Sequence, residues 1–110
     1  MRSTRNVVAE TKTEHFSDPP LLVLASLADG PRHGYAMIEE IERMSGQSLG
    51  PGTLYGAITR LDQQGLIEAL AVEDRRQPYK LTAAGRRVLR ARLLGMQQVA
   101  LIGLRKLEAR

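Results

Sequence analysis

Residues 50–67 read GPGTLYGAITRLDQQGLI, and this stretch decides the fold of the chain. It opens on a Pro/Gly turn and closes on a glycine that precedes a short apolar strand. Between these ends, apolar residues recur at the i, i+3, i+4, i+7 spacing of a helix that buries one face: Leu54, Ala57, Ile58 and Leu61. The opposite face is slim and polar, with one cation, Arg60, and one acid, Asp62. Such a helix fits the major groove of DNA, although the pattern also suits an ordinary solvated helix.

Two further helices are predicted ahead of this stretch. Ser17–Pro20 has the residues of a helix start, because its aspartate can cap free amides and proline is tolerated in the first turn. Leu21–Ala28 follows as a buried helix that the next Asp-Gly-Pro sequence ends. Gly34–Met44 forms another helix with an apolar inner stripe and an acidic outer face. Two short helices joined by a Gly-containing turn predict a helix-turn-helix.

A small β-hairpin is predicted after the helix-turn-helix. Leu66–Val72 has a strand-like composition, Glu73–Pro78 is a polar turn that carries arginines, and Tyr79–Leu81 is a second short strand. Two strands joined by a basic turn form a wing in this position. We therefore expect a mainly α (α+β) fold, with a winged helix-turn-helix over residues 17–82. Residues 1–16 are expected to form a flexible arm, either a solvated tail or a cationic segment that touches DNA.

A long C-terminal helix is predicted over residues 83–110. Its apolar residues form a heptad seam that continues for nearly three repeats: Leu89, Leu93, Met96, Ala100, Gly103 and Leu107. A domain this small has too little core to cover so wide an apolar face. We therefore expect a two-fold homodimer that packs through this helix. The alternative is a helix that folds back on its own chain.

The charge of the chain indicates an anionic partner. Its 110 residues suffice for one domain, and they carry a formal charge of +4 with a pI near 10.0. The segment from Arg75 to Arg92 is basic and contains no acidic residue. Its cations are Arg75, Arg76, Lys80, Arg86, Arg87, Arg90 and Arg92. This segregation predicts a positive face on the molecule.

Several classes of protein are not favoured by the sequence. The absence of cysteine excludes a disulfide framework, a thiolate metal site and a cysteine nucleophile. His15 and His33 are isolated in the sequence, so we expect no metal site. The sequence shows neither a nucleophile with a plausible base nor a phosphate-binding loop, so we expect neither an enzyme nor a bound cofactor. Neither a signal peptide nor about 18 consecutive apolar residues is present. We expect a cytoplasmic protein without a membrane span.

Three short motifs, in this order, resemble those of a known family. Gly30–Tyr35 is similar to a Gly-x-x-His-Gly-Tyr entry to the second helix of the motif. Gly52–Ile67 resembles a recognition helix with its following strand, and Tyr79–Gly85 resembles a Tyr-x-Leu-Thr-x-x-Gly exit from a wing. Together they cover roughly Leu21–Leu89 at the spacing of the PadR family of winged helix-turn-helix transcriptional regulators.

This resemblance implies a homodimeric regulator. It implies that the C-terminal helices join two protomers and that one recognition helix of each enters successive major grooves of a pseudo-palindromic operator. It also implies repression, often relieved by a small molecule at or near the dimer interface. Gly56 stands where many members carry a basic or polar residue, and the absence of tryptophan excludes their aromatic drug sandwich. A winged-helix protein-interaction module and another winged-helix family, such as the MarR type, remain alternatives.

Eight residues are the candidate DNA contacts. They lie at the start of the second helix, along the recognition helix and in the wing: Tyr35, Thr53, Tyr55, Thr59, Arg60, Arg75, Arg76 and Lys80. The first turn of a recognition helix can meet phosphates through its free amides and positive dipole end. A wing tip can reach the minor groove or its flanking phosphates. Alternatively, Thr53 only caps its helix, Tyr55 only packs, and Arg60 only forms a salt bridge.

Overall fold

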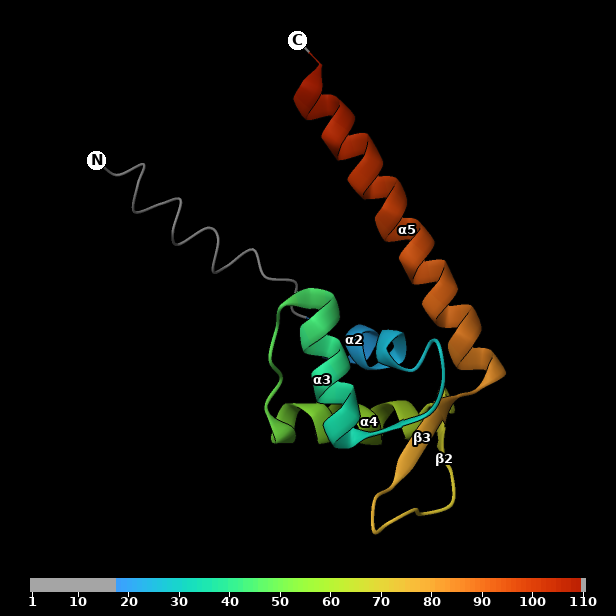
Figure 1. Ribbon diagram of the computed structural model, residues 1–110. Helices are drawn as coiled ribbons and strands as arrows, with labels where there is room; N and C mark the ends of the chain where they lie inside the picture. Colours follow the sequence, from blue (N-terminus) through green and yellow to red (C-terminus); the bar gives the residue numbers. More distant parts are fainter. Residues whose placement is uncertain (1–17, 110) are drawn as a thin grey trace, which may run out of the picture.

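The computed structural model describes residues 18–109, so the predicted arm over residues 1–16 lies outside them. Within this range there are four helices and three short strands. In chain order they are α2 (Pro19–Ser26), β1 (Arg32–His33), α3 (Gly34–Ser45), α4 (Pro51–Gln63), β2 (Ile67–Ala69), β3 (Pro78–Leu81) and α5 (Ala83–Glu108). The strands pair antiparallel in the order β1-β3-β2. The predicted mixed α+β winged helix-turn-helix is confirmed, and α5 projects away from the rest (Figure 1).

Helices α2, α3 and α4 enclose one aliphatic core. Helix α2 is the central element, because its apolar residues are buried on nearly every side. Helix α4 turns its predicted apolar stripe inward, with each of the four side chains at most 6% exposed. The buried set is Leu21, Leu22, Val23, Leu24, Leu27, Met37, Ile41, Leu54, Ala57, Ile58, Leu61, Ile67, Leu81 and Leu89. Burying each large aliphatic side chain contributes about 1.5–3 kcal/mol, so this core fixes how α4 presents its other face.

The sheet differs from the predicted hairpin in two ways. The strand expected over Leu66–Val72 spans only Ile67–Ala69, and β1 was not predicted. The hydrogen bonding between β2 and β3 weakens at Pro78, because proline has no N–H to donate to the carbonyl of Leu70. The side-chain amide of Gln77 takes over this role and donates to that carbonyl at 2.6 Å.

The end of α4 is tied to the start of α5. Gly65 leaves α4 with φ of 75°, a conformation that favours glycine. Thr82 donates from its N–H to the Leu66 carbonyl at 3.1 Å and from its Oγ1 to the Gly65 carbonyl at 2.7 Å. The same Oγ1 accepts the N–H of Gly85 at 3.0 Å, which confirms the predicted cap. A Cβ atom on Gly85 would lie 1.9 Å from the Leu66 carbonyl oxygen, so the contact requires glycine.

Arg32 connects the end of α2 to α3. Its Nη1 donates to the Ser26 carbonyl at 2.5 Å and to Asp29 Oδ1 at 2.6 Å, and its Nη2 lies 3.6 Å from Glu40 Oε1. Hydrogen bonding to Arg32 lowers the pKa of Asp29, and hydrogen bonding to Arg43 lowers the pKa of Glu40. Both carboxylates therefore stay ionised at mildly acidic pH and keep this connection in place.

Candidate nucleic-acid interface

Helix α4 exposes the polar face that the sequence predicted. Thr53, Tyr55, Thr59 and Arg60 are all exposed on the side opposite the core. The N-cap is Gly50, and no side chain caps the helix, so Thr53 is not the cap. The first amides of α4 therefore remain open to an outside acceptor. No salt bridge to Arg60 occurs among residues 18–109, so its charge is open to an outside anion.

The start of α3 lies against α4 through a tyrosine and a glycine. A Cβ atom on Gly34 would lie only 2.3 Å from the hydroxyl oxygen of Tyr55, so the tyrosine ring crosses this glycine. Tyr55 is nevertheless 50% exposed, so half of its surface remains open to an outside partner. Tyr35, the next residue of α3, is 63% exposed. The structure thus brings the two predicted tyrosines to the same end of α3.

The wing tip is a two-residue turn. Asp74 and Arg75 have φ of 50° and 65°, and Glu73 and Arg76 exchange backbone hydrogen bonds of 2.9 and 2.8 Å across it. Two consecutive positive φ values identify a type I′ turn, which matches the right-handed twist of the strands. Both arginines are exposed. The guanidinium of Arg76 also lies 3.2 Å from Nε2 of His33, so the wing contacts the residue just before α3.

Lys80 differs from the other candidate cations because its charge has a partner. It stands opposite Glu68 in the β2–β3 ladder, and the Lys80 Nζ atom lies 3.6 Å from Glu68 Oε2. Both side chains are about half exposed, so water screens this pair and its contribution to stability is small. Lys80 is therefore the weakest electrostatic candidate among the predicted contacts.

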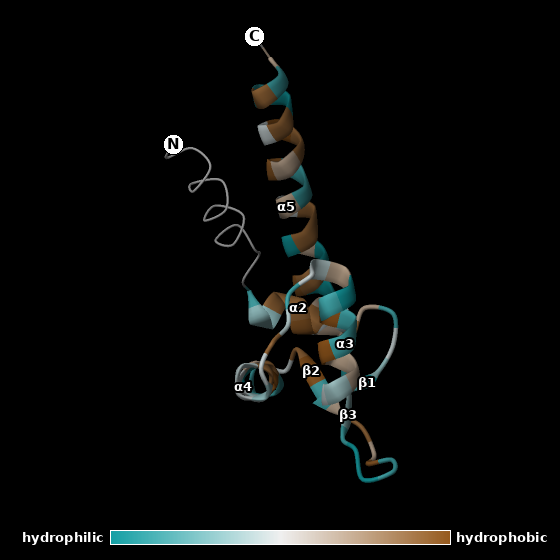
Figure 2. Ribbon diagram, turned by 60° about the vertical axis from the view of Figure 1, so that its left-hand side comes forward, coloured by the Kyte–Doolittle hydropathy of each residue, from teal (hydrophilic) through white to brown (hydrophobic). Residues whose placement is uncertain are grey.

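The candidate residues gather at one end of the molecule. Helix α4 and the β2–β3 hairpin lie at the end opposite the C-terminus of α5 in both views (Figures 1 and 2). His33 was missed as part of this site, although it lies inside the Gly30–Tyr35 motif. Its ring bridges the wing and α3 across 43 residues of sequence, and no local pattern reports such a contact.

Arg75 occupies a backbone conformation that a glycine would adopt more easily. We expect Arg75→Gly to raise the free energy of unfolding by about 0.5–1 kcal/mol, because a non-glycine residue with positive φ is strained. Urea unfolding measures this change. Arg75→Lys keeps both the strain and the charge and serves as the control. A glycine variant of equal or lower stability would show that the turn holds no strain.

The outer part of α5 has an uncovered apolar face. Leu93 is 42% exposed, Met96 40% and Leu107 80%, and brown residues recur along this helix in Figure 2. One predicted seam residue is corrected: Leu89 is only 4% exposed, because it packs into the chain's own core. We define the α5 seam by the remaining predicted residues, Leu93, Met96, Ala100, Gly103 and Leu107. An apolar hollow of about 290 Å³ between α2, α3 and α5 adjoins it.

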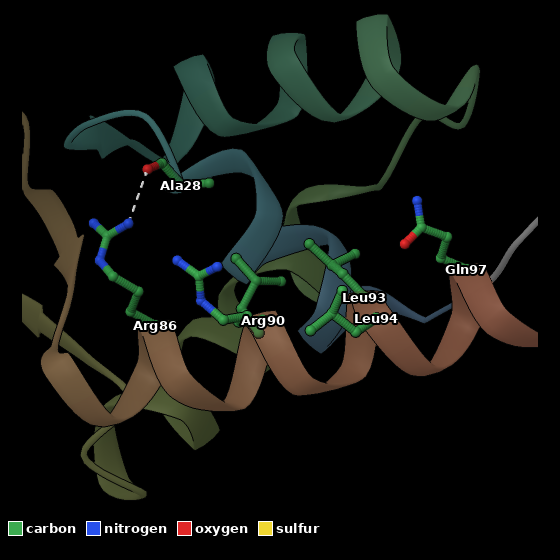
Figure 3. Close-up of a pocket in the computed structure, with 7 residues that line it drawn as sticks. Ala28, Arg86, Arg90, Leu93, Leu94 and Gln97 are labelled. Atoms are coloured by element: carbon green, nitrogen blue, oxygen red, sulfur yellow. Dashed lines mark hydrogen bonds between the residues drawn. The ribbon is translucent and has the colours of Figure 1, made fainter.

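A second cavity also adjoins α5 and shares Leu93 with this hollow. It measures about 410 Å³ and is lined by the following residues: Ala28, Arg86, Leu89, Arg90, Leu93, Leu94 and Gln97 (Figure 3). Arg86 donates to the carbonyl of Ala28 at 3.5 Å. Leucines form the apolar part of the wall, and two guanidinium groups form its charged part. This combination suits an organic anion with an apolar body.

Residues 18–109 contain neither a cluster placed to hold a metal ion nor a helix able to span a membrane. No cluster of three or more His, Cys, Asp or Glu side chains is placed to hold a metal ion in this part of the chain. None of the helices described is both long and apolar enough to cross a membrane.

Comparison with known proteins finds a matching family and related sequences. The family described as "Transcriptional regulator PadR-like family" matches residues 23–91, more than half of the chain. A transcriptional regulator of Mycobacterium tuberculosis is 35% identical over 83 residues, which cover 73% of this chain and 77% of that protein. An uncharacterized 37.1 kDa protein in transposon TN4556 of Streptomyces fradiae is 51% identical over 73 residues, 66% of this chain. The match spans only 21% of that protein.

A solved structure extends the similarity to three dimensions. The crystal structure of a PadR family transcriptional regulator from Eggerthella lenta superimposes with a TM-score of 0.71 at 28% sequence identity. The matched region covers 97% of this chain and 96% of the Eggerthella lenta chain. The similarity therefore includes the wing and the long α5 helix as well as the helix-turn-helix.

Proposed function

Because the chain belongs to the PadR-like family of transcriptional regulators, we propose that it binds double-stranded DNA with sequence specificity. It acts in the cytoplasm as a homodimeric repressor on a pseudo-palindromic operator. The winged helix-turn-helix over residues 17–82 is the DNA-binding domain, and the α5 seam joins the protomers. No catalytic activity is part of this proposal.

The exposed face of α4 carries the proposal. Its buried stripe fixes the helix, its first amides lack a side-chain cap, and Arg60 is free of salt bridges within residues 18–109. These features suit a helix that lies in a major groove and meets phosphates with its N-terminal turn. The exposed Arg75 and Arg76 lie on the hairpin at the same end of the molecule (Figure 1). They are suited to the adjacent minor groove or its phosphates.

The proposed operator follows from the proposed pairing of two protomers. A dimer of helix-turn-helix domains binds half-sites whose centres lie about 34–36 Å apart, one turn of the double helix. The exposed α5 seam and the adjoining hollow offer the apolar surface that such a dimer requires. Binding at an operator would then block transcription, which is the repression that we propose.

A small-molecule effector is also part of the proposal, with the cavity beside Arg86 and Arg90 as its support. The cavity lies where α5 leaves the core, and Figure 3 shows the side chains of both arginines on the α5 wall facing α2. An organic anion bound there would contact α5 and the end of α2 together. It could thereby change how α5 is oriented relative to the DNA-binding elements.

Arg60 provides the first test. In fluorescence anisotropy titrations with duplexes from the DNA flanking the gene, Arg60→Ala is expected to lose about 1–3 kcal/mol of binding free energy, roughly 5- to 150-fold in affinity. Arg105→Ala is the matched control, because it removes the same charge near the far end of α5. Equal affinities of the two variants would remove Arg60 from the interface. An absence of salt-dependent binding to any duplex would favour a protein-interaction module instead.

A further inference from the structure

The ring of His33 contacts two hydrogen-bond donors at the same time. Its Nδ1 atom accepts from the backbone N–H of Ala36 at 3.3 Å, which caps α3. Its Nε2 atom lies 3.2 Å from Nη1 of Arg76. An amide N–H and a guanidinium can only donate, so the ring has to be the acceptor in both contacts.

A neutral imidazole cannot accept both hydrogen bonds, because only one of its nitrogens carries a free lone pair. When Nδ1 accepts from Ala36, the proton sits on Nε2 and faces Arg76. When Nε2 accepts from Arg76, the proton sits on Nδ1 and the Ala36 amide loses its cap. The two contacts therefore belong to different tautomers of His33.

We expect the two tautomers to be close in free energy. A helix N-cap and a hydrogen bond to a charged group stabilise a protein by similar amounts. His33 lines an open cavity of about 190 Å³ together with Glu73, Asp74, Arg76 and Pro78. Arg76 is exposed and can turn away from the ring towards an outside anion. Loss of this one donor is sufficient to select the capping tautomer.

We propose that His33 is a positioning residue that works as a tautomeric latch for the wing. In the free protein it holds Arg76 against the start of α3. When Arg76 binds a DNA phosphate, the proton of His33 moves through solvent from Nδ1 to Nε2, and the freed Nδ1 lone pair caps α3. The DNA-dependent part rests on the proposed function. It couples the wing to the end of α3 that carries Tyr35, and such coupling is reciprocal.

The latch itself can be tested without DNA. The ¹⁵N resonances of labelled histidine distinguish a protonated from an unprotonated ring nitrogen, and at about pH 8 an ordinary imidazole is neutral. His15→Gln leaves His33 as the only histidine of the chain. In this background we expect a tautomer mixture, which Arg76→Met shifts to the form protonated at Nε2. The control Arg75→Met leaves the mixture unchanged. An Arg76→Met spectrum identical to its parent would overturn the latch.

DNA then tests the release step. Adding a duplex that binds should change the His33 spectrum in the same direction as Arg76→Met. It should change nothing in the Arg76→Met protein. A duplex that binds without altering the tautomer overturns DNA-triggered release. If the Arg76→Met shift appears but no duplex binds, the latch stands and the proposed function fails, so the two failures are distinguishable.

Affinity gives a second, independent readout. Asparagine is a good N-cap but has no ring nitrogen in the position that faces Arg76. His33→Asn therefore keeps the cap and removes the latch. Apparent affinity is reduced by the fraction of protein that is not binding-competent, so a latch populated between half and four fifths predicts about twofold to fivefold tighter DNA binding. Unchanged or weaker binding by a folded His33→Asn protein overturns the proposal.

Discussion

Gly85→Ala is expected to lower the free energy of unfolding by about 3 kcal/mol or more. The new Cβ atom would lie 1.9 Å from the carbonyl oxygen of Leu66, and backbone cannot move aside as a flexible side chain can. Separating the two segments would also break the hydrogen bonds of Thr82 to Gly65 and Leu66. Thermal unfolding followed by circular dichroism should show a melting temperature lower by roughly 10–20 °C.

Gly56→Ala is the matched control for this substitution. Gly56 also lies inside a helix, but a Cβ atom there meets nothing within 4 Å. Alanine is a better helix former than glycine, so this variant should be more stable by about 1 kcal/mol. A Gly85→Ala protein that melts at or above the wild-type temperature would show that α5 does not approach Leu66 so closely.

Leu93→Glu combined with Ala100→Glu should convert the proposed dimer into monomers and weaken DNA binding by about 10²-fold or more. The two substitutions place carboxylates in the middle of the α5 seam, where pairing would bury them without partners. A monomer also loses the advantage of engaging two half-sites at once. Light scattering measures the mass against the 12.2 kDa of one chain, and anisotropy measures the affinity.

Ala91→Glu combined with Gln98→Glu is the control for the dimer. These exposed residues are also seven apart on α5, but they lie on the side of the helix opposite Leu93 and Ala100. The control should remain dimeric and folded. A dimer that persists in the Leu93/Ala100 variant would place the contact between protomers elsewhere.

Local patterns in the sequence predicted most of the fold. Asp18 caps α2, Thr82 caps α5, and the apolar stripe of α4 faces the core, as expected. Each of these features depends on residues within about two helical turns, so spacing alone reports it. The same holds for the exposed face of α4, because a helix that buries one stripe must expose the other.

These local patterns do not predict contacts between segments that are distant in the sequence. Strand β1 forms because Arg32 and His33 pair with β3, more than 40 residues away. A two-residue segment has no sequence pattern that predicts such pairing. The contact of His33 with Arg76 is equally remote. Leu89 fits the heptad repeat of α5, but a heptad repeat does not distinguish a residue that packs into the core of its own chain from one that packs on a partner chain. Burial of Leu89 in the core shortens the seam by one residue.

The salt dependence of DNA binding tests the central claim most directly. The logarithm of the binding constant should fall linearly with the logarithm of the salt concentration, because phosphate contacts release counterions. Arg75→Ala combined with Arg76→Ala should reduce the magnitude of this slope by about two for each bound protomer and weaken binding similarly for all sequences. A wild-type protein whose binding does not depend on salt, or a double variant with the wild-type slope and affinity, would contradict a DNA-binding wing.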